Sequence, residues 1–401
     1  MRVHHFATSK SAGAGKAALR LHEAMNEFGL ESHFYSRKSG HQVHSVHESA
    51  IDLSYKNRMK SSFLTAVQSK FLQKSDFPVT TYSASVFSIS DNDYLNCDIL
   101  HIHAFYNLFS YASLKSLERI DKPIFFTLHD QRLMTGGCHY ALNCNKYMTS
   151  CEKCPQVHSI FHKTVSSSLD QLALLAANRN IRLVTPSSWI KEEAEKSRAL
   201  KYLPIRKIFN PIPNSYADVN REEARLRLEI SSHVYLLGFS AAILQSPFKG
   251  ISDFIEALNI LAEISPVSFE ILFIGHGLID ARDIPFRFKQ VSADSDEDVA
   301  RFLGALDLLV VPSIADNSPS IIGESQMAGT AVVGSRTGGI PELIDDERRL
   351  FEPNNPEDLA RVILENIKSS NSERIRSVAR DRFSYEKIAA IFSDYYLESL
   401  K

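Results

Sequence analysis

Two acidic side chains, Asp316 and Glu324, stand in a segment whose pattern could bind a charged ligand. An apolar run at 308–311 predicts a short strand, a polar loop follows at 313–320, and a helix is expected from about Ile321. The first turn of a helix offers unpaired N–H groups and partial positive charge to an anion. A carboxylate beside such a site suits a nucleotide sugar, with phosphates at one end and hydroxyls at the other. The alternative is an ordinary strand–helix connection with a solvated aspartate and a surface glutamate.

Other polar groups could contact the same ligand. Lys249 precedes an expected helix from about Ile251, and its compact ammonium charge suits a diphosphate. The loop residues predicted to bind the ligand beside Asp316 are Asn317, Ser318, Pro319 and Ser320. A diphosphate is therefore expected near Lys249 and the helix that follows Ser320.

The segment from Pro312 to Glu342 resembles the signature of retaining glycosyltransferases of family 4 (glycosyltransferase group 1), which have the GT-B fold. The matching positions are Pro312-Ser313, Glu324, Ala328-Gly329, Val332-Val333 and Gly338-Gly339-Ile340-Pro341-Glu342. Asp316 stands where a first glutamate is usual, and Thr330-Ala331 replaces a small residue followed by proline. The resemblance extends over nearly the whole chain.

This resemblance implies a role for each matching residue. Glu324 would hold the ribose hydroxyls, Asp316 would contact the donor sugar, and Lys249 would bind the pyrophosphate and stabilise it as it leaves. The family usually places an arginine several residues before this lysine, but 238–248 contains no basic residue. Arg336 is the predicted substitute, and the alternative for it is a solvated loop arginine.

A histidine, His129, follows the strand expected at 124–128. From its pattern alone, a single histidine beside Asp130 is usually a hydrogen-bonded core or surface residue. The resemblance implies instead a catalytic histidine that points at the donor sugar's hydroxyls. His101 and His103 are the runner-up candidates, since alternation along a strand puts both on one face. Both could equally be packing residues.

Small residues Gly13, Ala14 and Gly15 lie in a loop expected between the first strand and the first helix. The run is not a P-loop, because the leading glycine is absent and Ala17 occupies the metal-binding Ser/Thr position. Small side chains still let the backbone approach a ligand closely. The resemblance implies that this loop faces the donor phosphate and the acceptor. A flexible turn is the alternative.

Length and composition indicate an ordinary two-domain protein. The chain has 401 residues and a formal net charge of -2, which gives no electrostatic case for nucleic acid. Strands that alternate with helices predict parallel doubly wound sheets. The expected fold is α/β GT-B, with two Rossmann-like domains facing each other across a cleft. The predicted parts are 1–209 with a Cys-rich insert at 130–160, 214–384, and a C-terminal helix at 385–401 that returns to the N-terminal domain.

Four cysteines cluster in the insert, Cys138, Cys144, Cys151 and Cys154, while Cys97 stands apart. In a reducing compartment such a cluster more often indicates a metal than disulfides. The closing C-x2-C resembles a zinc motif, although the first pair is spaced more widely than usual. A structural zinc site is the favoured prediction. Two disulfides, a redox-variable pair and plain thiols remain open.

A basic amphipathic helix is expected at 55–74 and could lie on an anionic membrane surface. The alternative is a helix packed on its own domain. No apolar run is long enough to cross a membrane, and the N-terminus lacks the pattern of a secretory signal. The expected location is the cytoplasm, where the basic helix would allow peripheral contact with the inner face of the cytoplasmic membrane.

Together these features predict transfer of a sugar from a nucleotide-diphosphate donor to a hydroxyl of a glycan or lipid-linked saccharide, in cell-surface polysaccharide biosynthesis. The resemblance implies retention of anomeric configuration and no cofactor for catalysis. A weakly catalytic sugar-nucleotide-binding protein, a GT-B epimerase and a phosphorylase-like enzyme are the alternatives. Donor turnover without acceptor would indicate an epimerase, and a phosphate requirement would indicate a phosphorylase.

Overall fold

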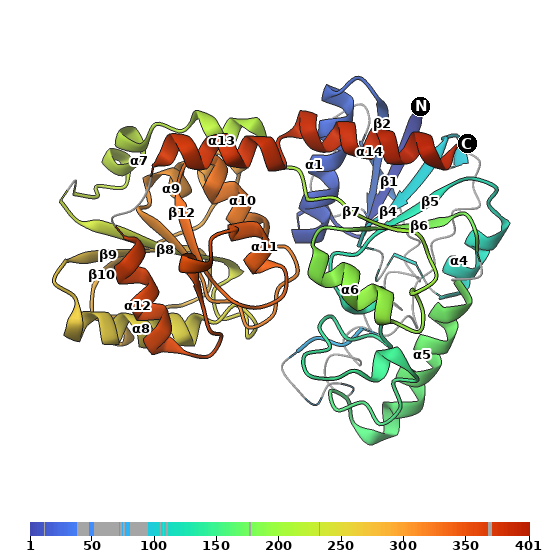
Figure 1. Ribbon diagram of the computed structural model, residues 1–401, viewed down its shortest axis with the longest axis horizontal. Helices are drawn as coiled ribbons and strands as arrows, with labels where there is room; N and C mark the ends of the chain where they lie inside the picture. The colour runs from blue at the N-terminus through green and yellow to red at the C-terminus, as the bar shows by residue number, and fades with distance from the viewer. Residues whose placement is uncertain are drawn as a thin grey trace. The chain divides into compact units, whose positions relative to one another are not determined.

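The computed structural model describes residues 1–11, 13–37, 48–51, 72, 74, 77–80, 95–104, 106, 108–109, 111–175, 178–231, 233–367 and 371–401. The chain divides into two compact units (Figure 1). The first unit contains Met1–Pro211 and Tyr385–Lys401, and the second contains Ile212–Ser384. The boundary between Pro211 and Ile212 falls between the predicted parts 1–209 and 214–384.

The first unit is built on a parallel sheet whose described strands follow the order β3-β2-β1-β4-β5-β6-β7. The strands are β1 (Arg2–Ala7), β2 (Glu31–Arg37), β3 (Glu48–Ile51), β4 (Ile99–Ile102), β5 (Ile124–Thr127), β6 (Ile181–Thr185) and β7 (Ile205–Lys207). The order reverses between β1 and β4. In open α/β sheets a ligand binds beside such a reversal, at the carboxyl ends of the strands.

Helices cover both faces of this sheet. They are α1 (Gly13–Glu27), α4 (Tyr111–Ser116), α5 (His162–Leu175), α6 (Ser188–Lys196) and α14 (Tyr385–Ser399). The C-terminal helix α14 lies beside α1 (Figure 1), and both pack on a face lined by Val3, Ile99 and Phe125. The opposite face, which carries Phe6 and Leu100, is covered by apolar residues of α4 and α5. Sheet residues therefore alternate between two cores, as period-two burial requires.

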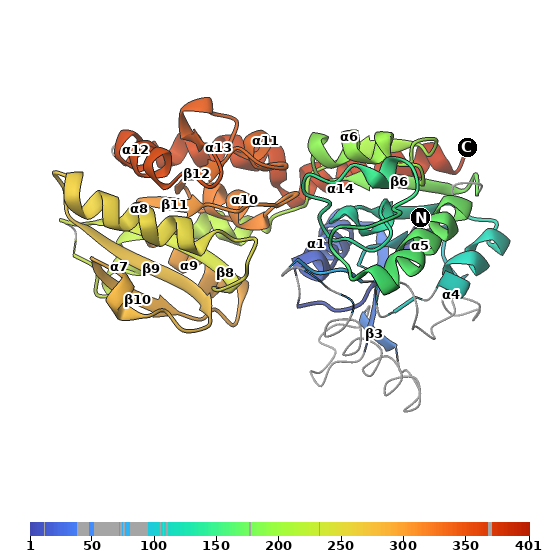
Figure 2. The same ribbon diagram turned by 90° about the horizontal axis from the view of Figure 1, so that it is seen from below.

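The second unit repeats this architecture. Its parallel sheet has the order β10-β9-β8-β11-β12-β13 among the residues described. The strands are β8 (Tyr235–Ile243), β9 (Phe269–His276), β10 (Arg287–Val291), β11 (Leu308–Val311), β12 (Ala331–Ser335) and β13 (Leu350–Phe351). The helices are α7 (Arg221–Arg227), α8 (Ile251–Ile264), α9 (Asp296–Ala305), α10 (Ser320–Met327), α11 (Ile340–Ile344), α12 (Pro356–Asn366) and α13 (Ser372–Phe383). Helices α8 and α12 lie side by side on one face (Figure 1, Figure 2), with α9 and α10 on the other.

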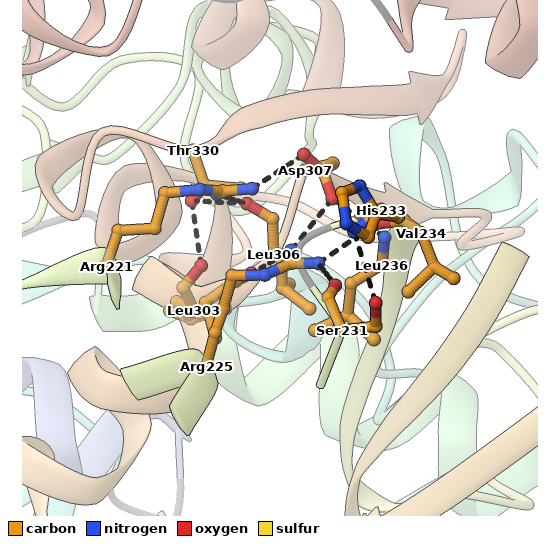
Figure 3. Close-up of polar contacts among 11 residues, drawn as sticks. Arg221, Arg225, Ser231, His233, Val234, Leu236, Leu303, Leu306, Asp307 and Thr330 are labelled. Carbon is orange, nitrogen blue, oxygen red and sulfur yellow. Dashed lines mark hydrogen bonds and ion pairs between the residues drawn. The ribbon is translucent and has the colours of Figure 1, made fainter. Parts of the chain in front are cut away.

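A polar network secures the amino end of β11 (Figure 3). The Asp307 carboxylate accepts hydrogen bonds from Arg221 Nη2 at 2.6 Å and from Arg225 Nη1 at 3.0 Å. It also accepts from the backbone N–H of Leu236 at 2.8 Å, which ties α7 to two neighbouring strands. The contacts join protein groups at the end of the sheet opposite the expected ligand edge, so we interpret the network as structural.

The predicted helices and strands agree with the structure in type. They differ from it in where some of them begin and in the edge strands of the sheets. The parallel doubly wound sheets are confirmed in both units. The loop predicted to contain Gly13, Ala14 and Gly15 is wrong at these positions, because α1 already begins at Gly13. The edge strands β3, β10 and β13 were not predicted, because short edge strands such as β10, RFKQV, carry a weak apolar pattern.

Candidate functional site

In the second unit, a lysine and an aspartate meet where the strand order reverses between β8 and β11. Lys249 Nζ lies 2.6 Å from Asp316 Oδ2, and the two side chains are 25% and 10% exposed. Lys249 follows β8 and Asp316 follows β11, so the ion pair joins the two loops that flank the reversal. The structure thus brings together two of the residues that the sequence singled out.

Two glycines fix these loops. Gly250 has φ +71°, and a Cβ there would lie 1.8 Å from the carbonyl oxygen of Pro312. Gly338 has φ +55°, and a Cβ there would lie 1.8 Å from the carbonyl oxygen of Asp316. Only glycine accepts both the left-handed conformation and the close backbone approach. The backbones next to Lys249 and Asp316 are therefore packed directly against other loops.

Helix α10 presents its amino end close in sequence to the ion pair. It begins at Ser320, one residue before the predicted start, and no side chain caps it because Pro319 occupies the N-cap. Glu324 lies on this helix and is 5% exposed. Asn317, between Asp316 and the helix, is buried as well. A buried carboxylate and a helix start without a side-chain cap are the groups that a ligand with hydroxyls and an anion would use.

Arg336, the predicted substitute for the missing arginine, has other partners. Its Nη1 lies 2.5 Å from Glu347 Oε2, and its Nε lies 3.0 Å from Glu352 Oε1. The Glu347 carboxylate, which contributes most, raises the pKa of the guanidinium further. Binding a diphosphate would require Arg336 to leave both carboxylates. The structure therefore does not join Arg336 to Lys249 and Asp316.

In the first unit, the glycine run has a packing role. Gly13, Ala14 and Gly15 form the first turn of α1 rather than a loop. A Cβ on Gly15 would lie 1.6 Å from the carbonyl oxygen of Ser9, whereas nothing lies within 4 Å of one on Gly13. Gly15 lets the chain after β1 pass close to the helix. The predicted ligand contact of this run stays a prediction.

Histidines form a series beside β1, β4 and β5, in which His5, His101 and His103 are buried and His129 is half-buried. The His101 and His103 rings share one face of the β4 segment, as predicted, with centroids 4.1 Å apart. His5 Nδ1 is hydrogen-bonded to His103 Nε2 at 3.1 Å, and His103 Nδ1 to His129 Nε2 at 3.3 Å. The sequence analysis missed His5. The signal was available, since His5 stands one strand away from His101 in direct register.

Three of these histidines, His5, His101 and His103, have ligand atoms within 4.8 Å of one another, the one such group found among the residues described. His101 Nδ1 contacts Tyr396 Oη at 2.6 Å, and its Nε2 contacts Thr127 Oγ1 at 2.7 Å. Because both ring nitrogens of His101 already have oxygen partners, we interpret the group as a hydrogen-bond network rather than a metal site.

His129 lines a small pocket at the carboxyl ends of β4 and β5, together with His103, Tyr106 and Arg132. The Arg132 guanidinium pairs with Asp130 and lies 3.5 Å from the centre of the Tyr106 ring. Desolvation lowers the pKa of His129 to about 4, although the Asp130 carboxylate acts in the opposite direction. His129 is therefore a neutral imidazole near pH 7, able to donate or accept a hydrogen bond.

The buried histidines should make stability depend on pH. Burial lowers the pKa values of His5, His101 and His103 well below 6.5. Below pH 6.5 the unfolded chain binds protons that the folded chain refuses, so the free energy of unfolding should fall as the pH falls. The expected loss is up to about 1.4 kcal/mol per pH unit for each histidine. Denaturant titrations at about pH 7 and about pH 5.5 measure it, and His101→Gln should reduce the slope.

The remaining predicted site residues lie elsewhere. Cys138, Cys144, Cys151 and Cys154 are reduced and line one pocket in the first unit. Most of the amphipathic helix predicted at 55–74 lies outside the described residues, namely 55–71 and 73. Its membrane contact therefore stays a prediction. None of the helices in the part of the chain that the structure describes is long and apolar enough to cross a membrane.

Comparisons with known sequences identify the class of protein. Residues 235–369 match the family model described as Glycosyl transferases group 1. An uncharacterized glycosyltransferase of Methanocaldococcus jannaschii is 24% identical over 350 residues, which are 79% of this chain and 88% of that protein. N-acetyl-alpha-D-glucosaminyl L-malate synthase of Bacillus anthracis is 22% identical over 322 residues, 76% of each chain. The matched region contains Lys249, Asp316 and Glu324.

Solved structures with the same fold cover both units. Sucrose-phosphate synthase from Thermosynechococcus elongatus has a TM-score of 0.65 and 17% identity, over 99% of this chain and 98% of its own. HepE of Anabaena, solved with UDP and glucose, has a TM-score of 0.61 and 16% identity, over 99% of this chain and 100% of its own. The predicted GT-B architecture of two Rossmann-like domains is confirmed. The matches together show a glycosyltransferase enzyme related to group 1.

Proposed function

We propose that this glycosyltransferase moves a sugar from a nucleotide-diphosphate donor to a hydroxyl of a glycan or lipid-linked saccharide, with retention of configuration. The Lys249–Asp316 ion pair, set at the reversal of the second sheet, carries the proposal. It stands in the region that matches the group 1 model, and Glu324 follows it on α10. The complex of HepE with UDP and glucose supports a nucleotide-sugar donor. Because the proposed acceptor is a glycan or lipid-linked saccharide, we propose cell-surface polysaccharide biosynthesis as the process.

The donor would bind to the second unit. Glu324 would accept hydrogen bonds from the ribose hydroxyls, and a carboxylate makes strong bonds of this kind. The diphosphate would lie against Lys249 and the first N–H groups of α10. The Lys249 ammonium group and the helix N-terminus are both fixed positive groups. Their attraction for the diphosphate grows as negative charge develops on it during its departure. These groups can supply that stabilisation without a divalent cation, so we expect none to be required.

Asp316 and His129 would act on sugar hydroxyls. Asp316 Oδ2 accepts a hydrogen bond from Lys249, and the second carboxylate oxygen would accept one from the donor sugar. His129, with a pKa of about 4, would serve as a neutral hydrogen-bond partner and not as a source of positive charge. The charge on the leaving group would therefore be balanced by Lys249 and the helix end.

The donor class can be tested by thermal shift across UDP-, GDP-, ADP- and dTDP-sugars. A ligand that binds only the folded state raises the melting temperature by mass action, and a concentration 100 times the dissociation constant adds about 2.7 kcal/mol. One nucleotide series should stand out. Product analysis with that donor then separates the outcomes: transfer to an acceptor supports the proposal. Binding without turnover indicates a binding protein, and turnover without acceptor indicates an epimerase.

Glu324→Gln is expected to raise the dissociation constant of the nucleotide sugar by more than about tenfold. Loss of hydrogen bonds to a charged acceptor costs roughly 1.5–3 kcal/mol. Calorimetry measures the change. The matched control is Glu270→Gln, because Glu270 is 6% exposed and Glu324 5%, yet Glu270 lies near the amino end of β9. Equal affinity for the Glu324 variant and wild type would remove Glu324 from the donor site.

A further inference from the structure

The segment between β5 and α5 is unusual in its lack of regular structure. Residues 128–161 contain three short 3-10 turns, at Gln131–Leu133, Lys146–Met148 and Ser159–Phe161, and no α-helix or strand. A stretch of this length without its own secondary structure is uncommon in a compact domain. It is nevertheless well buried in part, since Cys138, Cys151 and Cys154 are each at most 6% exposed. Some additional cross-link would explain why this segment holds one conformation.

The four cysteines of this segment surround one pocket. Cys138, Cys144, Cys151 and Cys154 line it, with Lys146 at its edge. The Cys138 and Cys154 side chains are hydrogen-bonded to each other. All four sulfurs are reduced, and they are spread more widely than the nitrogens of the histidine group. Thiol groups do not attract one another strongly, so an ion would draw the four sulfurs together.

Backbone N–H groups point at two of the sulfurs. The N–H groups of Gln156 and Val157 donate to Cys154 Sγ, and the N–H of Gly136 donates to Cys151 Sγ. Backbone groups that donate to a ligand atom hold that atom in position, as the outer partners of metal ligands do. They stand at the C-x2-C turn that zinc motifs use.

We propose that Cys138, Cys144, Cys151 and Cys154 bind one zinc ion through four thiolates. Thiolate sulfur is a soft donor that selects zinc over the hard cations magnesium and calcium. Four protein ligands complete a tetrahedral shell and leave no position for substrate, so the ion is structural and not catalytic. Lys146, whose Nζ donates to the carbonyl oxygen of Lys153 at 2.7 Å, offsets part of the negative charge of the site.

The zinc site would hold the loop that carries His129. The Gln131 backbone N–H donates to the carbonyl oxygen of His139 at 2.9 Å, and the Gln131 side-chain oxygen accepts from the Ala141 N–H at 2.6 Å. Gln156 Nε2 donates to the carbonyl oxygen of Tyr140 at 2.9 Å. The residues directly after His129 are therefore bonded to the backbone between the cysteines. Loss of the ion should loosen the His129 pocket.

Metal analysis of the full-length protein, purified without added metal or chelator, tests the site. About one zinc per chain is expected. Release by a mercurial reagent should be accompanied by exposure of the cluster thiols. Replacement by cobalt(II) should give the visible bands of a tetrahedral thiolate site. None of these readouts depends on sugar transfer, so failure of the proposed function would leave the zinc result intact, and the reverse also holds.

Variants separate this site from chance binding. Cys144→Ser and Cys154→Ser should each lose most of the zinc, while Cys97→Ser, a buried cysteine outside the segment, should retain it. If the serine variants fail to fold, the wild-type metal content and cobalt spectrum still decide the matter. Folded wild-type protein free of zinc, with four titratable thiols or two disulfides in the segment, would overturn the proposal. Iron with sulfide in place of zinc would overturn it as well.

Discussion

Lys249→Ala is expected to lower the turnover number by about a hundredfold, which is the usual loss when one group that stabilises developing charge is removed. The acceptor KM should change little, because negative charge on the diphosphate is greatest in the transition state. Steady-state kinetics with the donor found by thermal shift measure both quantities. Lys249→Arg, which keeps the positive charge, should recover part of the rate.

The controls for this variant come from the ion pairs of the second unit. Lys289 is 25% exposed like Lys249 and pairs with Glu229, but it lies on the edge strand β10. Lys289→Ala should keep wild-type turnover and so controls for loss of a paired lysine. Asp316→Asn tests whether the loss of turnover in Lys249→Ala comes from the Asp316 carboxylate that this substitution leaves unpaired.

Arg336→Ala should also keep the wild-type turnover number, because Arg336 already pairs with two glutamates. A large loss of turnover in this variant would restore Arg336 as the missing cation.

His129→Ala is expected to reduce transfer by about a hundredfold while leaving the affinity for the nucleoside diphosphate unchanged. The hydrogen bond to the sugar would contribute mainly in the transition state. Nucleotide affinity should be spared because Lys249, Asp316 and Glu324 belong to the second unit and His129 to the first. Turnover and nucleotide calorimetry on the same preparation test both parts.

The matched control is His33→Ala, which removes a half-buried histidine of the first unit that pairs with Glu31 on β2. It should transfer sugar at the wild-type rate. If His129→Ala does so too, the histidine is a packing residue, as the pattern of a single histidine beside an aspartate first suggested. A loss of nucleotide affinity equal to the loss of rate would show instead that the first unit contributes to donor binding.

The sequence by itself determined the parts of the fold that depend on local pattern. Apolar runs at 124–128 and 308–311 predicted the central strands β5 and β11, because strands buried on both faces need continuous apolar residues. The polar loop before α10 and the position of Glu324 on that helix followed from the same reasoning.

Only the tertiary structure decided which side chains meet. The Lys249–Asp316 pair joins residues 67 positions apart, and its formation depends on β8 and β11 being neighbours in the sheet. The pairing of Arg336 with Glu347 and Glu352 could not be predicted either. A sequence shows that a cation is present, but it does not show which carboxylates lie beside that cation in the fold. His5 belongs to the histidine series because β1 and β4 are paired in a register that places it opposite His101. Local pattern determines which face of an element is apolar, whereas strand order and register determine which polar groups come within a hydrogen bond of one another.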